Sequence, residues 1–502
     1  MTSTAPFADD VAQSAEPRLA QDAMPASRTA KLGLGVLSVY GSGALVENIT
    51  TQMVGQLLLF YLTIVCGLSG TVAGLVMGAT LFVDAFFDPV VGSLSDNSRS
   101  RHGRRHPFLL LSIIPMVAAF GLLFSIPPGL HGAALFAYAA IALFALRVGI
   151  SFFYVPYMAL GAELSDDYAE RSTVVAARVL FTVVGGVLFP ILAFGIFLKG
   201  PHGREDQAAY APLAWSCAAI VAFGALLSTV GTLRSRGRLA TAANDAGFSM
   251  MRFLGEGAEV LRNRSFLSLF VPCLILFVAL GAAGALTLHA NTFFWKLGSK
   301  ELLTLGLFAP IGGVVGVFAA ALLARVMEKR SIAMLGLALL GLAQVGPVTL
   351  NLTRMIGPSQ YVVTLIVSVI LITVGGVIAT ISFQSMMADA ADEHEHLHGA
   401  RREGLFFAGV TTAAKAASGL GLFVGGIVLD VIGFPHGLAA TPDKVAAIPV
   451  STINHLGIAY GPGASLFTAV AVMVLLTYKL TKADHARIQD DLKLRRAVKA
   501  AQ

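Results

Sequence analysis

Apolar segments of about 20 residues recur along most of the chain, and each is long enough to cross a hydrocarbon core of roughly 30 Å. The chain has 502 residues, of which 56% are hydrophobic and only 13% are charged. A soluble domain carries about 25% charged residues. We therefore expect an all-α integral membrane protein that crosses the bilayer many times.

The apolar segments predict twelve membrane-spanning helices in two six-helix halves. The spans are 33–64, 69–97, 107–128, 132–162, 173–199, 211–233, 264–295, 302–325, 331–352, 359–390, 404–433 and 456–480. The polar segment 234–263 follows the sixth span and reads as a linker between the halves 33–233 and 264–480, the layout of a two-halved transporter. Residues 1–32 are polar and predict a disordered tail, and 481–502 form a basic tail.

Basic residues gather in alternate loops. They follow the second span, fill the 234–264 segment and return in the C-terminal tail, whereas the opposite loops are short and nearly free of them. Positive charge stays on the cytoplasmic side of a membrane, so both termini are expected there. The net charge of +6 thus reflects topology and does not indicate a nucleic-acid partner.

Two aspartates, Asp84 and Asp88, lie four residues apart inside the second predicted span. They share one helix face, and Asp84 falls near the bilayer midplane. An ionised group at that depth costs several kcal/mol unless it is paired or hydrated, so it indicates a functional site. A purely structural ion pair between helices is the alternative. Pro89 follows directly and frees a backbone carbonyl beside the carboxylates.

Further charged and polar residues fall within other predicted spans. They are Glu47 and Asn48 in span 1, Arg147, Ser151 and Tyr154 in span 4, Arg178 in span 5 and Lys415 in span 11. Arg147 lies at the depth of Asp84, and charges from both halves at one depth indicate a central cavity. For Arg178, near a helix end, the alternative is a side chain that merely reaches toward the membrane surface.

Opposite charges flank two neighbouring helix ends on the expected cytoplasmic side. Asp96, Arg101, Arg104 and Arg105 follow span 2, and Asp166, Asp167, Glu170 and Arg171 follow span 4. Such pairs would close the cytoplasmic side and part as the halves rock. Charge that only sets topology is the alternative.

Residues 394–398 read HEHLH and satisfy the H-E-x-x-H pattern of zinc proteases. The pattern falls at the end of span 10, directly before Gly399, and no third ligand is evident. We expect a solvated, His-rich loop, with an intramembrane metalloprotease as a remote alternative. The three cysteines, Cys66, Cys217 and Cys273, have no paired spacing and indicate neither disulfides nor a metal site.

Three stretches together resemble a known family. They are DAFFDPVVGSLSDNSRSRHGRRHPF from Asp84, FFYVPYMALGAELSDDYAERSTVVAARVLF from Phe152, and ADAADEHEHLHGARREGLFFAGVTTAAKAASGLG from Ala388. The chain is similar to the glycoside–pentoside–hexuronide:cation symporters of the major facilitator superfamily, over residues from about 33 to 480.

This resemblance implies a transporter of the bacterial inner membrane in which Asp84 and Asp88 bind the coupling cation. It also implies that Lys415 lies near the cation site and that Arg178 contacts a sugar. The chain departs from the melibiose-type pattern in three positions. Tyr154 stands in place of a third acidic residue on span 4, Met158 replaces a sugar-stacking tryptophan, and Asn48 replaces a sugar-binding aspartate beside Glu47.

These departures lead to a specific hypothesis. A guanidinium at 4 Å would repel Na⁺ by roughly 4 kcal/mol at an effective dielectric near 20. We expect Arg147 to pair with Asp84 and leave Asp88 as the protonatable group, so H⁺ is favoured over Na⁺ as the coupling ion. The substrate is expected to be a sugar, glycoside or uronide, carried by a monomer without a cofactor. A lysolipid-type transporter of the same fold and an uncoupled facilitator remain alternatives.

Overall fold

The computed structural model describes residues 32–100, 103–165, 167–200, 202–233, 263–399, 403–438 and 448–501. These residues form helices and no strand. Eleven of the described helices are long and apolar enough to cross a membrane. The all-α membrane fold is thus confirmed. Residues 1–31 of the predicted N-terminal tail and 234–262 of the linker lie outside the described residues.

The first half contains the first six spans. Its elements are α1 (Leu34–Ser42), α2 (Ala44–Gln52), η2 (Met53–Leu58), η3 (Tyr61–Val65), α3 (Gly70–Asp96), α4 (His106–Leu123), α5 (Gly132–Glu163), α6 (Tyr168–Pro190), η4 (Ile191–Phe197) and α7 (Gln207–Leu233). The predicted span 33–64 is divided among α1, α2 and the π-helical segments η2 and η3. Such π-helical turns are frequent at functional sites.

The second half contains the remaining spans and a C-terminal helix. Its elements are α9 (Arg264–His289), η6 (Ala290–Phe294), α10 (Ser299–Val326), α11 (Lys329–Leu352), α12 (Pro358–His398), α13 (Glu403–Val431), α15 (Val450–Ile458), η8 (Ala459–Gly463), α16 (Ala464–Leu475) and α17 (Lys482–Ala501). The last span therefore occupies 450–475, several residues earlier than the predicted 456–480.

The expectation of a loop at 394–398 is wrong, because α12 continues to His398 and ends at Gly399 in the left-handed conformation, with φ 76°. Helix α17 packs against this end. There Arg496 binds the Glu395 carboxylate at 2.8 Å, and Arg495 donates to the His396 carbonyl. His394 is buried. No group of three or more potential metal ligands occurs among the described residues.

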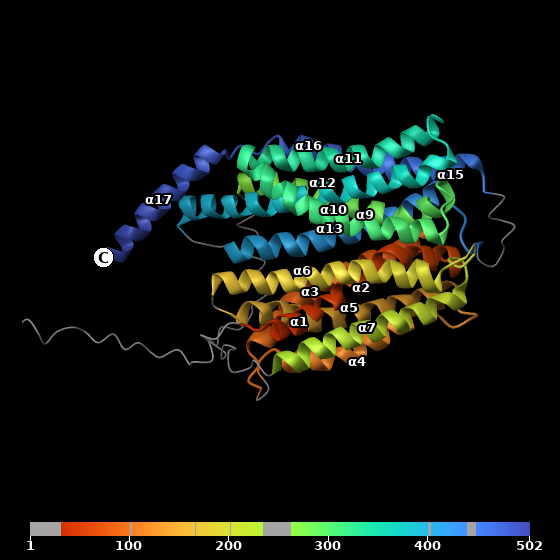
Figure 1. Ribbon diagram of the computed structural model, residues 1–502, viewed down its shortest axis with the longest axis horizontal. Coiled ribbons are helices and arrows are strands. Elements are labelled where there is room, and N and C mark those ends of the chain that lie inside the picture. Colours follow the sequence, from red (N-terminus) through yellow and green to blue (C-terminus); the bar gives the residue numbers. More distant parts are fainter. Residues whose placement is uncertain are drawn as a thin grey trace, which may run out of the picture.

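The two halves repeat one packing pattern. In the first half, α5 packs on α3 and α4, α4 also contacts α7, and α1 contacts α6 and α7. In the second half, α12 packs on α10 and α11, α11 also contacts α16, and α9 contacts α13 and α16. These are the same helix pairs counted from the start of each half. Figure 1 shows α1 to α7 below and α9 to α16 above, with α3 against α13 and α6 against α10 between them.

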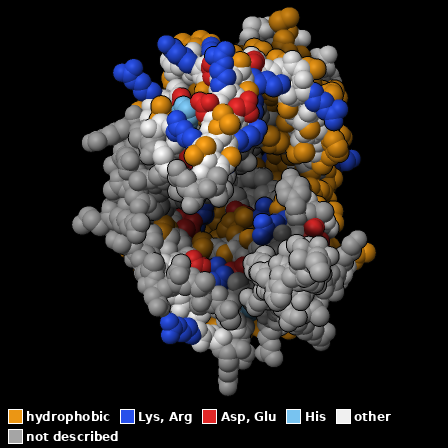
Figure 2. Space-filling model, turned by 90° about the vertical axis from the view of Figure 1, so that its left-hand side faces the viewer, with side chains coloured by type: hydrophobic (Ala, Val, Ile, Leu, Met, Phe, Trp, Pro, Cys, Tyr) orange, Lys and Arg blue, Asp and Glu red, His pale blue; other side chains and the backbone are white. Residues whose placement is uncertain are grey.

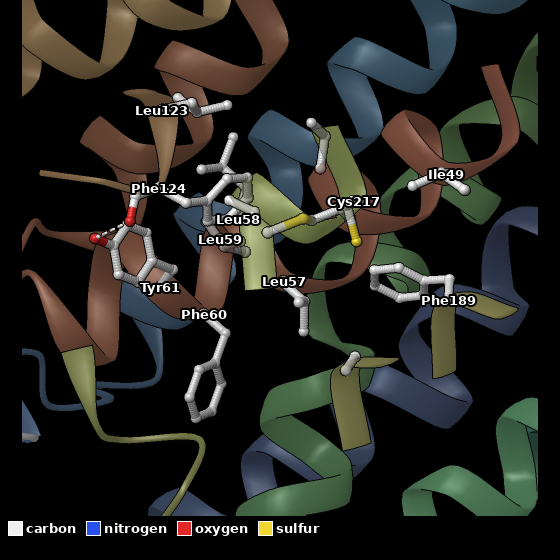
Figure 3. Close-up of a cluster of buried hydrophobic side chains, with 14 of the residues drawn as sticks. Ile49, Leu57, Leu58, Leu59, Phe60, Tyr61, Leu123, Phe124, Phe189 and Cys217 are labelled. Carbon is white, nitrogen blue, oxygen red and sulfur yellow. Dashed lines mark hydrogen bonds between the residues drawn. The ribbon is translucent and has the colours of Figure 1, made fainter. Parts of the chain in front are cut away.

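The first span runs through the core of its half. Leu57, Phe60 and Tyr61 are fully buried, and Figure 3 shows them among buried side chains from other helices, including Phe124 and Cys217. The Tyr61 hydroxyl donates to the Phe124 carbonyl at 3.1 Å. The first span is thus placed to carry its polar residues into the centre of the molecule.

The two halves are joined at the end opposite the termini. Asp430 of α13 accepts from the backbone N–H groups of Gly70 and Thr71, which begin α3. Thr63 Oγ1 lies 3.0 Å from His289 Nε2, and both side chains are buried. We call these contacts, together with the bonds from Arg204 and Ser299 described below, the outer seal.

Two further hydrogen bonds complete the outer seal. Arg204 Nη1 donates to the Leu297 carbonyl at 2.7 Å, and Ser299 Oγ donates to the Leu198 carbonyl at 2.6 Å. Arg204 lies in the loop before α7, and burial lowers the pKa of its guanidinium while Glu205 opposes that shift. Buried side chains from both halves therefore close this end.

The end near the termini is open. Figure 2 views the molecule from that end and shows a hollow between the halves in which Lys, Arg, Asp and Glu side chains are visible. At this end the ion pairs Arg104–Glu163 and Lys329–Asp389 each stay within one half. The structure is thus sealed on one side and accessible from the side of its termini.

Candidate functional site

Two acid–base pairs lie inside the membrane-spanning region. Arg147 of α5 donates to Asp84 of α3 at 3.1 Å, which is the pair expected from the sequence. Lys415 of α13 donates to Asp88 at 2.5 Å. Lys415, which the family resemblance placed near the cation site, thus contacts Asp88, and each aspartate has a cationic partner. The first pair joins helices of one half, and the second joins the two halves.

The two pairs differ in their access to water. The Asp84 side chain is 4% exposed and Arg147 is 17% exposed, whereas Asp88 and Lys415 are 21% and 30% exposed. Asp84 Oδ1 and Arg147 Nε are buried and have no hydrogen-bond partner among the described residues. The Asp84–Arg147 pair is thus the more enclosed of the two, and the Asp88–Lys415 pair is the more exposed.

Glycines bring α3 against α13. A Cβ added at Gly70 would collide with the Gly426 carbonyl, and one at Gly78 would come within 2.8 Å of the Gly419 carbonyl. Small residues at such spacing let membrane helices approach closely. The close packing of α3 on α13 places the Asp88 carboxylate within reach of the Lys415 ammonium.

The first span contributes a row of polar side chains. Gln52 Nε2 donates to Asn48 Oδ1 at 2.8 Å, and Gln56 Nε2 donates to Gln52 Oε1 at 3.2 Å. A Cβ at Gly185 of α6 would lie 2.8 Å from Asn48 Oδ1, so a glycine there makes room for this row. Glu47 lies within hydrogen-bonding reach of the Tyr154 hydroxyl.

Arg178 of α6 contacts a sulfur atom instead of a carboxylate oxygen among the described residues. Its Nη1 contacts the Met158 sulfur at 2.7 Å, and no carboxylate of the described residues forms an ion pair with it. Glu47 interacts electrostatically with Lys415, Arg178 and Arg147. Together with Asp84 and Asp88, these groups form a central cluster of three acids and three bases, whose formal charges cancel.

The charged residues that were expected to close the cytoplasmic side by pairing between the ends of spans 2 and 4 have other partners in the structure. Arg104 and Arg105 bind Glu163, the last residue of α5, at 2.6 and 2.9 Å, and Arg105 also pairs with Asp96. Arg105 is 5% exposed, and all four residues of this cluster belong to the first half. These ion pairs therefore connect helices within the first half and do not join the two halves.

The acidic residues after span 4 have other partners. Asp167 caps α6 by accepting from the Glu170 N–H at 2.9 Å. Glu170 accepts from Ser165 Oγ and from the Leu32 N–H. Arg101 and Asp166 lie outside the described residues. Glu163 was missed because a helix-end glutamate gives no pattern that marks its partner.

The outer seal was also missed. Three of its residues, His289, Thr63 and Asp430, lie near the ends of spans. An isolated polar residue at such a position is typical of the membrane surface, so the sequence did not indicate that they make contacts between the halves. Only the folded chain brings these segments together, since Thr63 and His289 are 226 residues apart.

Comparison with known proteins agrees with this architecture. The family model for MFS/sugar transport proteins matches residues 39–482. An uncharacterized symporter of Synechocystis sp. is 25% identical, covering 93% of this chain and 97% of that protein. The glucuronide carrier protein homolog of Escherichia coli is 23% identical, covering 82% and 87%. Among solved structures, a bacterial homolog of the human lysosomal transporter Spinster has a TM-score of 0.63 at 12% identity, covering 89% and 98%.

The family match covers nearly all of the membrane-spanning region, and the repeated helix packing is that of a two-halved transporter. The chain is therefore a multi-pass membrane transporter and not an enzyme. It belongs to the MFS/sugar transport protein family, as a member of the glycoside–pentoside–hexuronide:cation symporters.

Proposed function

We propose that this protein imports a sugar, glycoside or uronide by symport with protons, through alternating access of a monomer whose termini are cytoplasmic. The observation that carries the proposal is the Asp88–Lys415 pair between α3 and α13. Ionised Asp88 ties the two halves together through Lys415. A proton on Asp88 removes the ion pair, so proton occupancy and the arrangement of the halves become linked.

A proton suits this site better than Na⁺. Na⁺ would have to lie beside Asp84 or Asp88 while Arg147 and Lys415 remain close, and each cation at 4 Å repels it by roughly 4 kcal/mol at an effective dielectric near 20. A proton instead binds the carboxylate directly and releases its partner. The proton is a cosubstrate, and no cofactor is proposed.

The charge of the central cluster favours an acidic sugar. Loading one proton on Asp88 leaves the cluster one unit positive, and a bound uronide carboxylate restores neutrality. Arg178 has no carboxylate partner among the described residues and presents a planar fork suited to one. Cotransport of a proton with a uronide would therefore keep the buried charge balanced.

Transport of a lysolipid is the second candidate. A cavity of about 590 Å³ lies between α6 and α10, with Asn48 and Gln52 in its lining. Val179, Val317 and Phe318 also line it and are each at least half exposed, as expected of a face toward lipid. An apolar chain would fit such an opening.

A ligand screen separates these candidates. Melting temperature is measured for the purified protein with methyl β-glucoside, methyl β-xyloside, methyl β-glucuronide or lysophosphatidylcholine, at two pH values, with and without Na⁺. We expect the glucuronide to stabilise most, with an effect that depends on pH and not on Na⁺. Arg178→Gln should weaken its binding by about tenfold or more, because a charge-assisted bidentate contact is lost.

Each other outcome has a defined meaning. Stabilisation by a sugar only with Na⁺ would contradict proton coupling. Equal weakening of glucoside and glucuronide by Arg178→Gln would contradict the role of Arg178 in binding a carboxylate. Stabilisation by lysophosphatidylcholine alone would favour the second candidate. Arg487→Gln, on α17, is the matched control for loss of one arginine.

A further inference from the structure

A second cavity lies in the C-terminal half, beside the outer seal. Its volume is about 240 Å³, and its lining comes from α9, η6, α10, α11, α12 and η8, with Gln56 and Phe194 from the first half. The described residues that line it include no Asp, Glu, Lys, Arg or His. The polar members are Gln56, Thr287, Asn291, Trp295, Gln344, Ser368 and Tyr460. This cavity is therefore neutral, in contrast to the central cluster of charges.

Several polar groups in the lining have unused hydrogen-bonding capacity. Trp295 is 1% exposed, and its indole Nε1 has no hydrogen-bond partner among the described residues. Gln344 is buried and uses its carbonyl oxygen to accept from Ser465 Oγ, which leaves its amide N–H groups free. No hydrogen bond joins the Asn291 side chain to another described residue. A buried donor without a hydrogen bond costs about 1–3 kcal/mol of folding free energy. A ligand that accepts hydrogen bonds from these groups would recover that cost.

The chemistry of the lining matches a hydroxylated ring. Trp295 and Gln344 bring donors to the lining, Asn291 and Gln56 bring side-chain amides, and apolar side chains such as Leu305 and Val348 form the remaining walls. Mixed donors and acceptors in an apolar cavity fix the orientation of a small neutral ligand. A hydroxyl both donates and accepts, so it can satisfy either kind of group.

The cavity shares lining residues with the polar row of the first span and with the cavity between α6 and α10. Gln56 lines it and also ends the row Asn48–Gln52–Gln56 on the first span. Gln56, Gly306 and Ala309 line both this cavity and the one between α6 and α10. Leu288 and Asn291 flank His289 of the outer seal, so a ligand here lies next to the contacts that must part when that side opens.

We infer that this cavity is a subsite for a neutral, hydroxylated ring of the substrate, held by Trp295, Asn291 and Gln344 of the second half and by Gln56 of the first. The inference rests on the proposed sugar transport and extends it. A substrate bound in this way touches both halves, through Gln56 of the first and through Asn291, Trp295 and Gln344 of the second.

Tryptophan fluorescence tests the assignment directly, because the chain has only two tryptophans. Trp215 is 45% exposed on α7, and Trp215→Phe leaves Trp295 as the single emitter. Methyl β-glucoside, methyl β-xyloside and methyl β-glucuronide are titrated into this variant. We expect the glycoside that raises the melting temperature to change Trp295 emission saturably, with a midpoint equal to its Kd.

Variants of the lining supply the second readout. Gln344→Ala and Asn291→Ala should each raise that midpoint by about tenfold, as loss of a buried hydrogen bond to ligand predicts. Gln489→Ala, an exposed amide on α17, should leave it unchanged. Trp295→Phe keeps an aromatic ring but removes the indole N–H, so it should lower the affinity measured from ligand-induced melting shifts.

The negative outcomes can be told apart. A glycoside that stabilises the protein but leaves Trp295 emission and the Gln344→Ala midpoint unchanged would overturn the subsite and leave sugar transport standing. If none of the three glycosides stabilises the protein, the proposed function fails and the subsite fails with it.

Discussion

Asp88→Asn is expected to abolish proton-driven accumulation of the substrate while leaving substrate binding nearly intact. The asparagine side chain keeps the shape of aspartate but carries no exchangeable charge, so the link to Lys415 no longer depends on a proton. For one coupled proton, a gradient of one pH unit supports about tenfold accumulation. The variant should reach an internal concentration about equal to the external one, with Kd within a factor of about three.

Uptake into proteoliposomes under an inward pH gradient measures this effect, and ligand-induced melting shifts measure Kd. Asp490→Asn is the matched control, because Asp490 forms an exposed ion pair with Lys493 on α17, far from the central cluster. Normal accumulation by Asp88→Asn would show that coupling does not run through this carboxylate.

Asp84→Asn is expected to have the largest effect on stability. The Arg147 guanidinium would then lie in a largely enclosed site without its one carboxylate partner. Removing one member of a buried ion pair costs about 3–5 kcal/mol, since the remaining charge is left uncompensated. The melting temperature of the purified protein should fall by many degrees, far more than for Asp88→Asn, whose partner Lys415 is 30% exposed.

The double variant Asp84→Asn with Arg147→Gln provides the decisive comparison. Replacing both charges removes the uncompensated cation, so the double variant should be more stable than Asp84→Asn alone. The two effects are then non-additive, and the coupling energy measures the pair. Strictly additive losses would mean that Asp84 and Arg147 act independently, contrary to the structure.

The sequence predicts features that depend on depth in the membrane. The positions of the spans follow from the length of the apolar segments. Arg147 was predicted to lie opposite Asp84 because the two residues lie about equally far along spans that run in the same direction. Depth does not determine which neighbour a side chain faces. Lys415 was assigned to the cation site only through family resemblance, and its contact with Asp88 depends on the close packing of α3 on α13.

Helix ends were the least predictable parts of the chain. Hydropathy falls wherever polar residues begin, so the end of α12 was predicted at 390, although the helix continues to His398 and packs against α17. Similarly, Asp167 caps α6 by accepting from the Glu170 N–H, and the arginines after α3 bind Glu163. Several carboxylates lay at similar sequence distances from these arginines, and only the folded structure shows which of them each arginine binds.

The most direct test of proton symport is uptake by the wild-type protein in proteoliposomes. The uronide or glycoside with the largest melting shift is followed under an inward H⁺ gradient without Na⁺, and under an inward Na⁺ gradient at equal pH. The account predicts accumulation above the external concentration with the H⁺ gradient alone. Accumulation driven only by Na⁺, or mere equilibration under both gradients, would contradict it.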